Sequence, residues 1–283
     1  MELGTYNTLK VVRETDLAWM LTDGEEEVFL HKKEAERSYL PGEELTVFLY
    51  ADNLGRLTAS LKQPLATTTT AAFLEVVSVN HEYGVFLANG IAKDLLLSKD
   101  DLPLSVNAWP VVGDKLFCTV KAKKGLLFAK VVARKAVSTI LRPATPLEPD
   151  QNYEAIVSHF IVEGLILHTE SGHEIFVHEN NTRKKYRLGE TVSVRILKLN
   201  PDGEAVGTLI QQKELMLQPD ADIILAYLEA HAGRMRFTDA SAPEEIQAAF
   251  HMSKGAFKRA LGTLYRDGRV ELRPDQTLLK TDR

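Results

Sequence analysis

A nine-residue pattern occurs three times along the chain, and it constrains the fold more than any other feature of the sequence. Each copy contains a glycine, then an acidic residue, then a run in which apolar and polar side chains alternate: 41–49, 112–120 and 188–196. The glycines, Gly42, Gly113 and Gly189, are 71 and 76 residues apart. Because this spacing exceeds the 20–50-residue period of solenoid repeats, it predicts three copies of one domain-sized unit.

The remainder of each copy predicts a compact all-β domain. An opening strand is followed by a second strand, a short third strand, the Gly-acid strand and a final strand after a tight turn. That turn is supplied by three glycine-containing segments, 53–56, 123–126 and 201–204. Glycine accepts the positive φ that such hairpin turns need. Five short strands in roughly 65 residues indicate a small closed barrel.

Two stretches without periodicity predict connectors between the copies, at 63–70 and 141–149. Prolines in the second stretch favour extended backbone, so we expect a semi-rigid spacer there. After Pro219 the apolar period changes from two to 3.6, which indicates helices. These limits predict barrels at 1–62, 69–140 and 150–214, and a different domain at 216–283.

The last domain predicts three helices and two strands. We expect helices over 221–231, over 243–250 with Pro243 in its first turn, and from the N-cap Ser253 to a point before Gly268. Strands are expected at 269–272 and 277–280, on either side of a turn. Three helices followed by a β-hairpin resemble the winged-helix fold.

Three short segments resemble the S1 motif, an RNA-binding OB-fold barrel with a glycine-aromatic strand, a Phe-Val-His-like strand and the Gly-acid strand. They are 83–87 (YGVFL), 29–31 (FLH) and 176–179 (FVHE). The expected fold class is therefore multidomain and mainly β, with three tandem five-stranded OB-fold (S1-like) barrels followed by an α+β winged-helix domain. This domain order resembles the conserved virulence factor B family of bacterial RNA-binding regulators. The resemblance implies single-stranded RNA as the partner and a role in gene expression or RNA fate.

Composition and charge limit the class of ligand and the compartment. The net charge of −5 argues against a uniformly basic nucleic-acid binder, but residues 69–140 alone carry +3, against −5 for 1–62, −3 for 141–215 and 0 for 216–283. The single cysteine, Cys118, cannot form an internal disulfide, which fits a reducing cytoplasm. No export signal or membrane-spanning stretch is recognisable, so we expect a cytoplasmic protein without a membrane partner.

An OB barrel binds single strands by stacking bases on exposed aromatic side chains while basic groups follow the backbone. In the FLH segment Phe29 and His31 share one face of the strand, because neighbouring residues point to opposite sides. The RNA-binding residues expected on this basis are Trp19, Phe29, His31, Arg56, Phe86, Lys124, Lys130, Phe176, His178 and Arg195. Each aromatic residue also has an interpretation as a core residue, which for Trp19 is the stronger of the two.

The third predicted helix of the last domain has one apolar and one basic face. Phe257, Ala260, Leu261 and Leu264 fall on the apolar face, and opposite them lie Lys258, Arg259 and Arg266. In a winged helix this element is the recognition helix, so these three cations are further RNA-binding candidates that would contact phosphate. The alternative is that they are ordinary solvated charges.

Catalysis, cofactors and metals have no support in the sequence. Acidic runs such as 25–27 and 100–101 have no nucleophile or glycine-rich phosphate loop beside them. His168, His173 and His178 are spaced so that successive histidines alternate between strand faces, which does not suit a metal site. Two other functions stay open: a winged-helix DNA-binding transcription factor that uses the barrels as protein-interaction modules, and an accessory protein that brings an RNA-processing enzyme to bound RNA.

Overall fold

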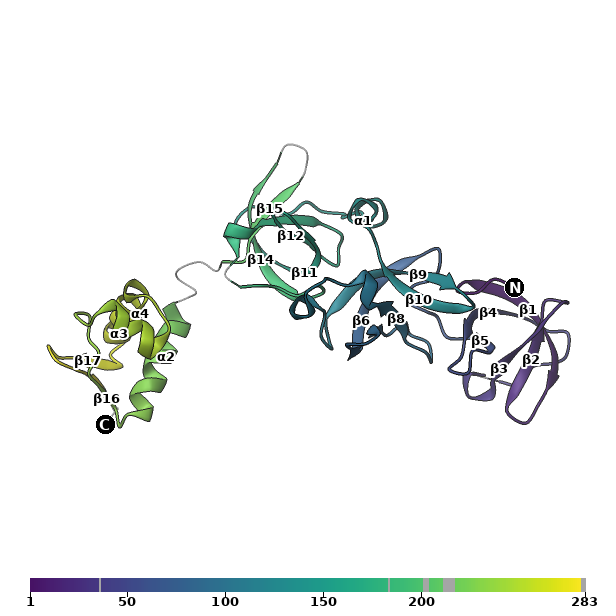
Figure 1. Ribbon diagram of the computed structural model, residues 1–283, viewed down its shortest axis with the longest axis horizontal. Coiled ribbons are helices and arrows are strands. Elements are labelled where there is room, and N and C mark those ends of the chain that lie inside the picture. Colours follow the sequence, from purple (N-terminus) through teal and green to yellow (C-terminus); the bar gives the residue numbers. More distant parts are fainter. Residues whose placement is uncertain (36, 183, 201–203, 211–216, 281–283) are drawn as a thin grey trace. The chain divides into compact units, whose positions relative to one another are not determined.

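The computed structural model describes residues 1–35, 37–182, 184–200, 204–210 and 217–280, and side chains of the last range from 220 onward. The chain divides into two compact units, residues 1–209 and 210–283. The first unit holds three closed five-stranded barrels, and the described part of the second holds three helices and a three-stranded sheet (Figure 1). The fold class expected from the sequence is confirmed.

Each barrel has the same strand order, in which the fifth strand lies between the third and the fourth. The third and fifth strands run parallel, and the other neighbours run antiparallel. Barrel 1 contains β1 (Tyr6–Glu14), β2 (Ala18–Thr22), β3 (Glu27–His31), β4 (Glu44–Ala51) and β5 (Leu57–Ser60). Barrel 2 contains β6 (Ala71–Asn80), β7 (Gly84–Leu87), β8 (Leu95–Ser98), β9 (Lys115–Lys123) and β10 (Leu126–Val131). Barrel 3 contains β11 (Asn152–Ile161), β12 (Gly164–His168), β13 (Glu174–His178), β14 (Thr191–Leu199) and β15 (Ala205–Thr208).

The repeated Gly-acid turn has the same internal contact in all three barrels. Its glycines have φ values of +87°, +92° and +82°, a left-handed conformation that favours glycine. The acidic side chain that follows accepts a hydrogen bond from the backbone N–H three residues before it, from Leu40 to Glu43, from Val111 to Asp114 and from Arg187 to Glu190. The acid is therefore repeated because it closes the turn that leads into the fourth strand.

A basic residue lies beside each of these carboxylates. Arg37 pairs with Glu43, and Lys184 Nζ lies 2.6 Å from Glu190 Oε1, so barrels 1 and 3 supply their own partner. In barrel 2 the partner comes from the next barrel, because Arg187 Nε lies 3.2 Å from Asp114 Oδ2. The turn thus joins barrel 2 to barrel 3. Lys115 N also donates to Gly189 O at 3.1 Å, which strengthens the same junction.

Each connector is anchored to a barrel core by a buried side chain, while residues 142–146 are exposed, so the semi-rigid spacer expected at 141–149 stays a prediction. Ala66 is fully buried in the core of barrel 2, and Leu147 is buried in the core of barrel 3. The short helix α1 (Arg134–Ile140), which the sequence analysis did not predict, precedes the second connector. It has no side-chain cap and is anchored by the buried Val137.

The second unit has the winged-helix arrangement. It consists of α2 (Leu217–Ala230), β16 (Arg234–Met235), α3 (Pro243–Phe250), α4 (Lys254–Arg266), β17 (Val270–Leu272) and β18 (Thr277–Leu279). Ser253 caps α4 as expected, accepting a hydrogen bond from Ala256 N at 3.2 Å. The first helix begins four residues earlier than expected, and the two-residue strand β16, absent from the sequence expectation, adds a third strand beside β18.

No helix among the described residues is both long enough and apolar enough to cross a membrane.

Candidate nucleic-acid interface

Cross-strand pairing brings five side chains of barrel 2 into one line on the outer surface of the barrel. Successive partners in the register are Ser78, Phe86, Leu96, Phe128 and Lys121, from β6, β7, β8, β10 and β9. The neighbours of Phe86, Leu96 and Phe128 along their strands point inward and pack in the core. All five members are exposed or half-exposed. We refer to these five residues as the barrel-2 row.

The barrel-2 row contains a ring that the sequence analysis missed. Phe86 was expected as a stacking residue, but Phe128 was not, although it alternates with the expected Lys130 along β10. The buried Ala129 between them fixes Phe128 and Lys130 on the outer face. The alternation was a sufficient signal. Once Lys130 is assigned to the outer face of β10, Phe128, two positions before it, must lie on the same face.

Lysines surround the barrel-2 row on the same side of the sheet. Lys121 and Lys123 alternate along β9, Lys130 lies on β10, and Lys124 occupies the tight turn between these strands with φ +51°. All four are exposed, and within the described residues none of them has an ion-pair partner. Cations that are not neutralised by a neighbouring carboxylate remain available to phosphate.

In barrel 1 the corresponding register positions are Arg13, Met20, Phe29, Thr58 and Tyr50, of which Thr58 and Tyr50 are buried. Three basic side chains at or beside these positions are neutralised internally. Arg13 lies 2.7 Å from Glu27, and Lys32 lies 2.6 Å from Glu14. Arg56 lies over the Phe29 ring, 4.7 Å from its centroid, and is held there by two hydrogen bonds to Asp52. The expected residues Phe29 and Arg56 are thus in contact, and one face of the half-buried ring is already occupied by a guanidinium group.

Trp19 is not a stacking residue, which corrects its place among the candidates. Its side chain is 4 % exposed and packs edge-to-face on Tyr39 in the core of barrel 1, with ring centroids 5.7 Å apart. Trp19 lies on the same side of β2 as the fully buried Leu21, so strand alternation turns it inward. A base cannot reach this ring in the folded barrel.

The two expected histidines share a local structural role. His31 and His178 each accept a hydrogen bond at Nδ1 from a backbone N–H two residues later, which caps the short 3₁₀ helices Lys32–Glu34 and Glu179–Asn181. Ser98 does the same in barrel 2 through its hydroxyl group. Because Nδ1 accepts, the neutral ring carries its proton on Nε2, which leaves a hydrogen-bond donor for a ligand.

In barrel 3 the outer face is partly covered by the chain that leads out of barrel 2. His159 Nε2 lies 3.1 Å from the carbonyl oxygen of Val132, and Arg134 pairs with Glu174 at 2.7 Å. Ile166 and His168, which point outward from β12, are consequently buried. Ile166, which lies at the position that Phe86 has in barrel 2, is therefore not available to a ligand.

Glu174 is the electrostatic centre of that contact. The imidazole of His168, whose Nε2 lies 3.4 Å from Glu174 Oε2, and the guanidinium of Arg134 lower the pKa of this carboxyl to about 2. Burial lowers the pKa of the neighbouring His159. An ionised Glu174 thus stabilises the junction between barrels 2 and 3.

Next to this junction, the expected pair Phe176 and His178 is half-buried, with edge-to-face rings 6.3 Å apart. The expected Arg195 is less available, because its side chain is 20 % exposed and pairs with Asp150 at 3.2 Å. These residues form a smaller outer patch than the barrel-2 row.

On α4 of the second unit, the four expected apolar residues are buried and the three expected cations are exposed. Lys258 lies 3.7 Å from Asp239, and Arg266 lies 3.9 Å from Asp267. Arg259 has no ion-pair partner among the described residues. Of the three expected cations on α4, one is therefore unneutralised within the described residues, compared with four lysines on β9, β10 and the turn between them.

The remaining histidine and cysteine side chains are held in structural contacts. Within the described residues, no group of three or more histidine, cysteine or acidic side chains could hold a metal ion. His168 is hydrogen-bonded to the Ser158 hydroxyl group, and His173 is hydrogen-bonded to the Thr145 carbonyl oxygen. Cys118 is fully buried, and burial raises the pKa of its thiol.

Comparisons with known proteins agree with this architecture. A family model described as an S1 domain matches residues 3–62, and one described as the CvfB first S1-like domain matches residues 71–130. A third, described as a CvfB-like winged helix domain, matches residues 222–279. These three matches fall on barrel 1, barrel 2 and the winged-helix unit.

Similar proteins align with nearly the whole chain. YitL of Bacillus subtilis is 34 % identical over 271 residues, which cover 95 % of this chain and 91 % of YitL. Conserved virulence factor B of Staphylococcus saprophyticus is 34 % identical over 249 residues, with coverage of 86 % and 82 %. A crystal structure of a multidomain protein with nucleic acid binding domains from Streptococcus pneumoniae has a TM-score of 0.68 and 27 % identity, with 98 % of each chain covered. The chain belongs to the conserved virulence factor B family.

Proposed function

We propose that the protein binds single-stranded RNA on the outer face of barrel 2, and that this binding regulates gene expression or RNA fate. The observation that carries the proposal is the barrel-2 row, in which Phe86 and Phe128 lie on either side of Leu96 among four lysines that have no ion-pair partner in the described part of the chain. The family relationship and the S1-type barrels support it.

The chemistry of the face suits an unpaired strand. A base stacked on an aromatic ring contributes about 1–3 kcal/mol, and this requires bases that are not already stacked in a duplex. The lysines at the edge of the row would contact the phosphates that connect the stacked bases. No chemical step is involved, so we propose a binding protein without catalytic activity that acts where bacterial RNA is found, in the cytoplasm.

A competition assay tests the class of ligand. A labelled single-stranded RNA oligonucleotide is bound to the full chain and displaced by unlabelled single-stranded RNA, single-stranded DNA or duplex DNA at one salt concentration. We expect single-stranded RNA to compete best. Tighter binding of duplex DNA would instead support the winged-helix transcription factor, for which the unpartnered Arg259 on α4 is the specific observation.

A pair of substitutions tests the site. Phe86→Ala with Phe128→Ala should weaken RNA binding about 30-fold or more if each ring stacks one base. Tyr6→Ala is a matched control, because Tyr6 is 44 % exposed on barrel 1 and lies outside the row. Both substituted rings are half-buried, so the fold of barrel 2 must be checked through the fluorescence of Trp109 in its core, in a Trp19→Phe background that removes the tryptophan of barrel 1. A folded double variant with undiminished affinity would exclude this face.

A further inference from the structure

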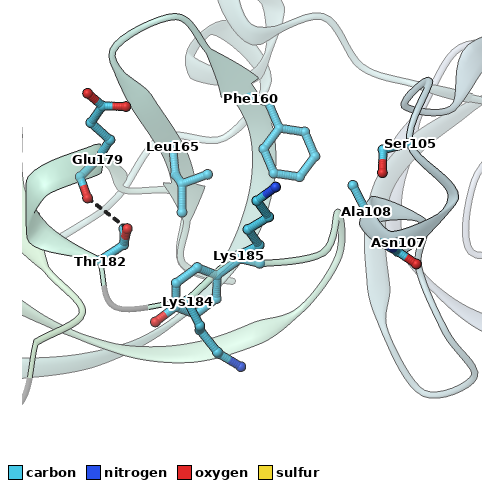
Figure 2. A pocket seen from close by; sticks show the side chains of 10 residues that line it. Ser105, Asn107, Ala108, Phe160, Leu165, Glu179, Thr182, Lys184 and Lys185 are labelled. Carbon is cyan, nitrogen blue, oxygen red and sulfur yellow. Dashed lines mark hydrogen bonds between the residues drawn. The ribbon is translucent and has the colours of Figure 1, made fainter.

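A cavity of about 320 Å³ lies where barrel 3 meets barrel 2, separate from the barrel-2 row. Barrel 3 contributes Phe160, Leu165, Thr182 and residues 184–186, and barrel 2 contributes Ser105, Asn107 and Ala108 at the 3₁₀ helix Val106–Ala108 (Figure 2). Most of its lining is apolar. This volume is at the lower end of the roughly 300–1,000 Å³ that small-ligand pockets have, so it suits one nucleoside-sized group.

The walls are held in position by contacts between the two barrels. Leu188 N donates a hydrogen bond to the carbonyl oxygen of Ala108, a lining residue, at 3.0 Å. The Arg187–Asp114 ion pair lies one residue further along the chain from the lining segment. Thr182 is fixed on the other side by a 2.7 Å hydrogen bond to Glu179 O. A cavity with walls fixed in this way needs little rearrangement before it binds a ligand.

The chemistry of the lining points to an aromatic group that carries a negative charge. Phe160 is 39 % exposed although it is a large apolar side chain, and its ring faces the Lys185 side chain, as Figure 2 shows. Lys185 has no ion-pair partner among the residues that the structure describes. Figure 2 also shows the Glu179 carboxylate directed away from this pair. The side chains of Ser105 and Asn107, on the opposite wall, have no hydrogen-bond partner within the described chain and could read polar base edges.

We infer that this cavity holds one nucleotide of the bound RNA strand, with the base against Phe160 and Leu165 and its phosphate at Lys185. The inference rests on the proposed RNA-binding function and adds to it a second contact point, on the junction of barrels 2 and 3. Unlike the exposed row on barrel 2, a concave pocket with walls on two sides limits the size of the base and offers polar groups to its edge. The cavity is therefore a site for base selectivity, whereas the row stacks any base.

The test compares two double variants of the full chain with the wild type, by anisotropy of a labelled single-stranded RNA. Phe160→Ala with Lys185→Ala should weaken binding about 5- to 150-fold, the equivalent of one lost base stack. The control, Val162→Ala with Lys62→Ala, removes an exposed apolar and an exposed basic side chain outside the cavity and should bind like the wild type. A 4-thiouridine oligonucleotide should cross-link to peptides that contain Phe160 or Tyr186.

The outcomes separate the two proposals. If the cavity variant binds like the wild type while Phe86→Ala with Phe128→Ala loses affinity, the cavity proposal is overturned and RNA binding stands. If the wild type binds no single-stranded RNA, both proposals fail. Uridine and adenosine monophosphates serve as a further probe: saturable binding that the cavity substitutions abolish, with RNA affinity unchanged, would identify a site for free nucleotides and overturn the inference for RNA.

Discussion

Replacing three lysines of barrel 2 should change how RNA binding depends on salt. Lys121→Gln, Lys123→Gln and Lys130→Gln remove three exposed charges that have no ion-pair partner in the described chain, and glutamine keeps most of each aliphatic stem. Each phosphate contact on a single strand contributes about −0.7 to the slope of log K against log salt. Three lost contacts should therefore make the slope shallower by about 2.

The magnitude is large enough to measure. Between 50 and 200 mM salt, a slope difference of about 2 means that the wild type loses roughly 20-fold more affinity than the variant. The assay is RNA anisotropy titration at four or five salt concentrations. The aromatic variant of the same face should bind more weakly with nearly the wild-type slope, because stacking releases no counterions.

The control removes the same formal charge from barrel 1. Lys10→Gln, Arg13→Gln and Lys32→Gln substitute side chains that are already paired with acidic residues, so their loss should leave the slope near the wild-type value. If the barrel-2 variant keeps the wild-type slope, or if the barrel-1 control changes it equally, the reasoning from unpaired lysines is refuted. The same titration tests α4 with a triple variant, Lys258→Gln, Arg259→Gln and Arg266→Gln. A shallower slope for this variant would indicate that α4 also contacts phosphate.

Three further predictions concern stability. Gly84→Ala should strongly destabilise barrel 2, seen as a lower denaturation midpoint by Trp109 fluorescence, because a Cβ would lie 2.0 Å from Leu97 O at φ +136°. Gly262→Ala on α4, where a Cβ would meet nothing within 4 Å, should instead stabilise the winged-helix unit by about 1 kcal/mol, measured by circular dichroism melting. Since the pKa of Glu174 is lowered to about 2, its stabilisation is complete above its ordinary pKa and is lost as the pH falls from about 5 to 2. Over that range the wild type should lose about 1–3 kcal/mol more than Glu174→Gln, by urea denaturation.

Local patterns predicted most of the fold because they are determined by neighbouring residues. The Gly-acid turns, the hairpin turns of barrels 1 and 2 and the capped helix α4 follow from φ preferences and alternation, which act over a few residues. The hairpin turn predicted at 201–204 falls largely outside the described residues. Helix α1 could not be predicted in this way, since it is seven residues long without a side-chain cap and is held by Val137 packing on other elements. Isolated helices of this length are unstable in water.

The site was predicted less completely because the availability of a side chain depends on long-range packing. Phe29 and His31 do share a face, as alternation required, but nothing near Phe29 in the sequence indicated that Arg56 covers its ring. The burial of Ile166 and the cavity beside Phe160 arise where two barrels meet, so neither has a signal within one repeat. Phe128 is different, because its alternation with Lys130 in the sequence was enough to place it on the outer face, although it was not predicted.

Arg187 determines whether barrel 2 can be separated from barrel 3 without loss of an ion pair. Arg187 belongs to barrel 3 but neutralises the buried Asp114 of barrel 2. If the chain is cut between these barrels, Asp114 loses its counter-charge. In barrels 1 and 3 the same turn carries a basic partner from its own barrel. A gene rearrangement that deleted or exchanged barrel 3 alone would have the same effect on its neighbour. We therefore expect barrels 2 and 3 to be retained or lost together as one evolutionary unit. Barrel 1 has the complete turn within its own sequence.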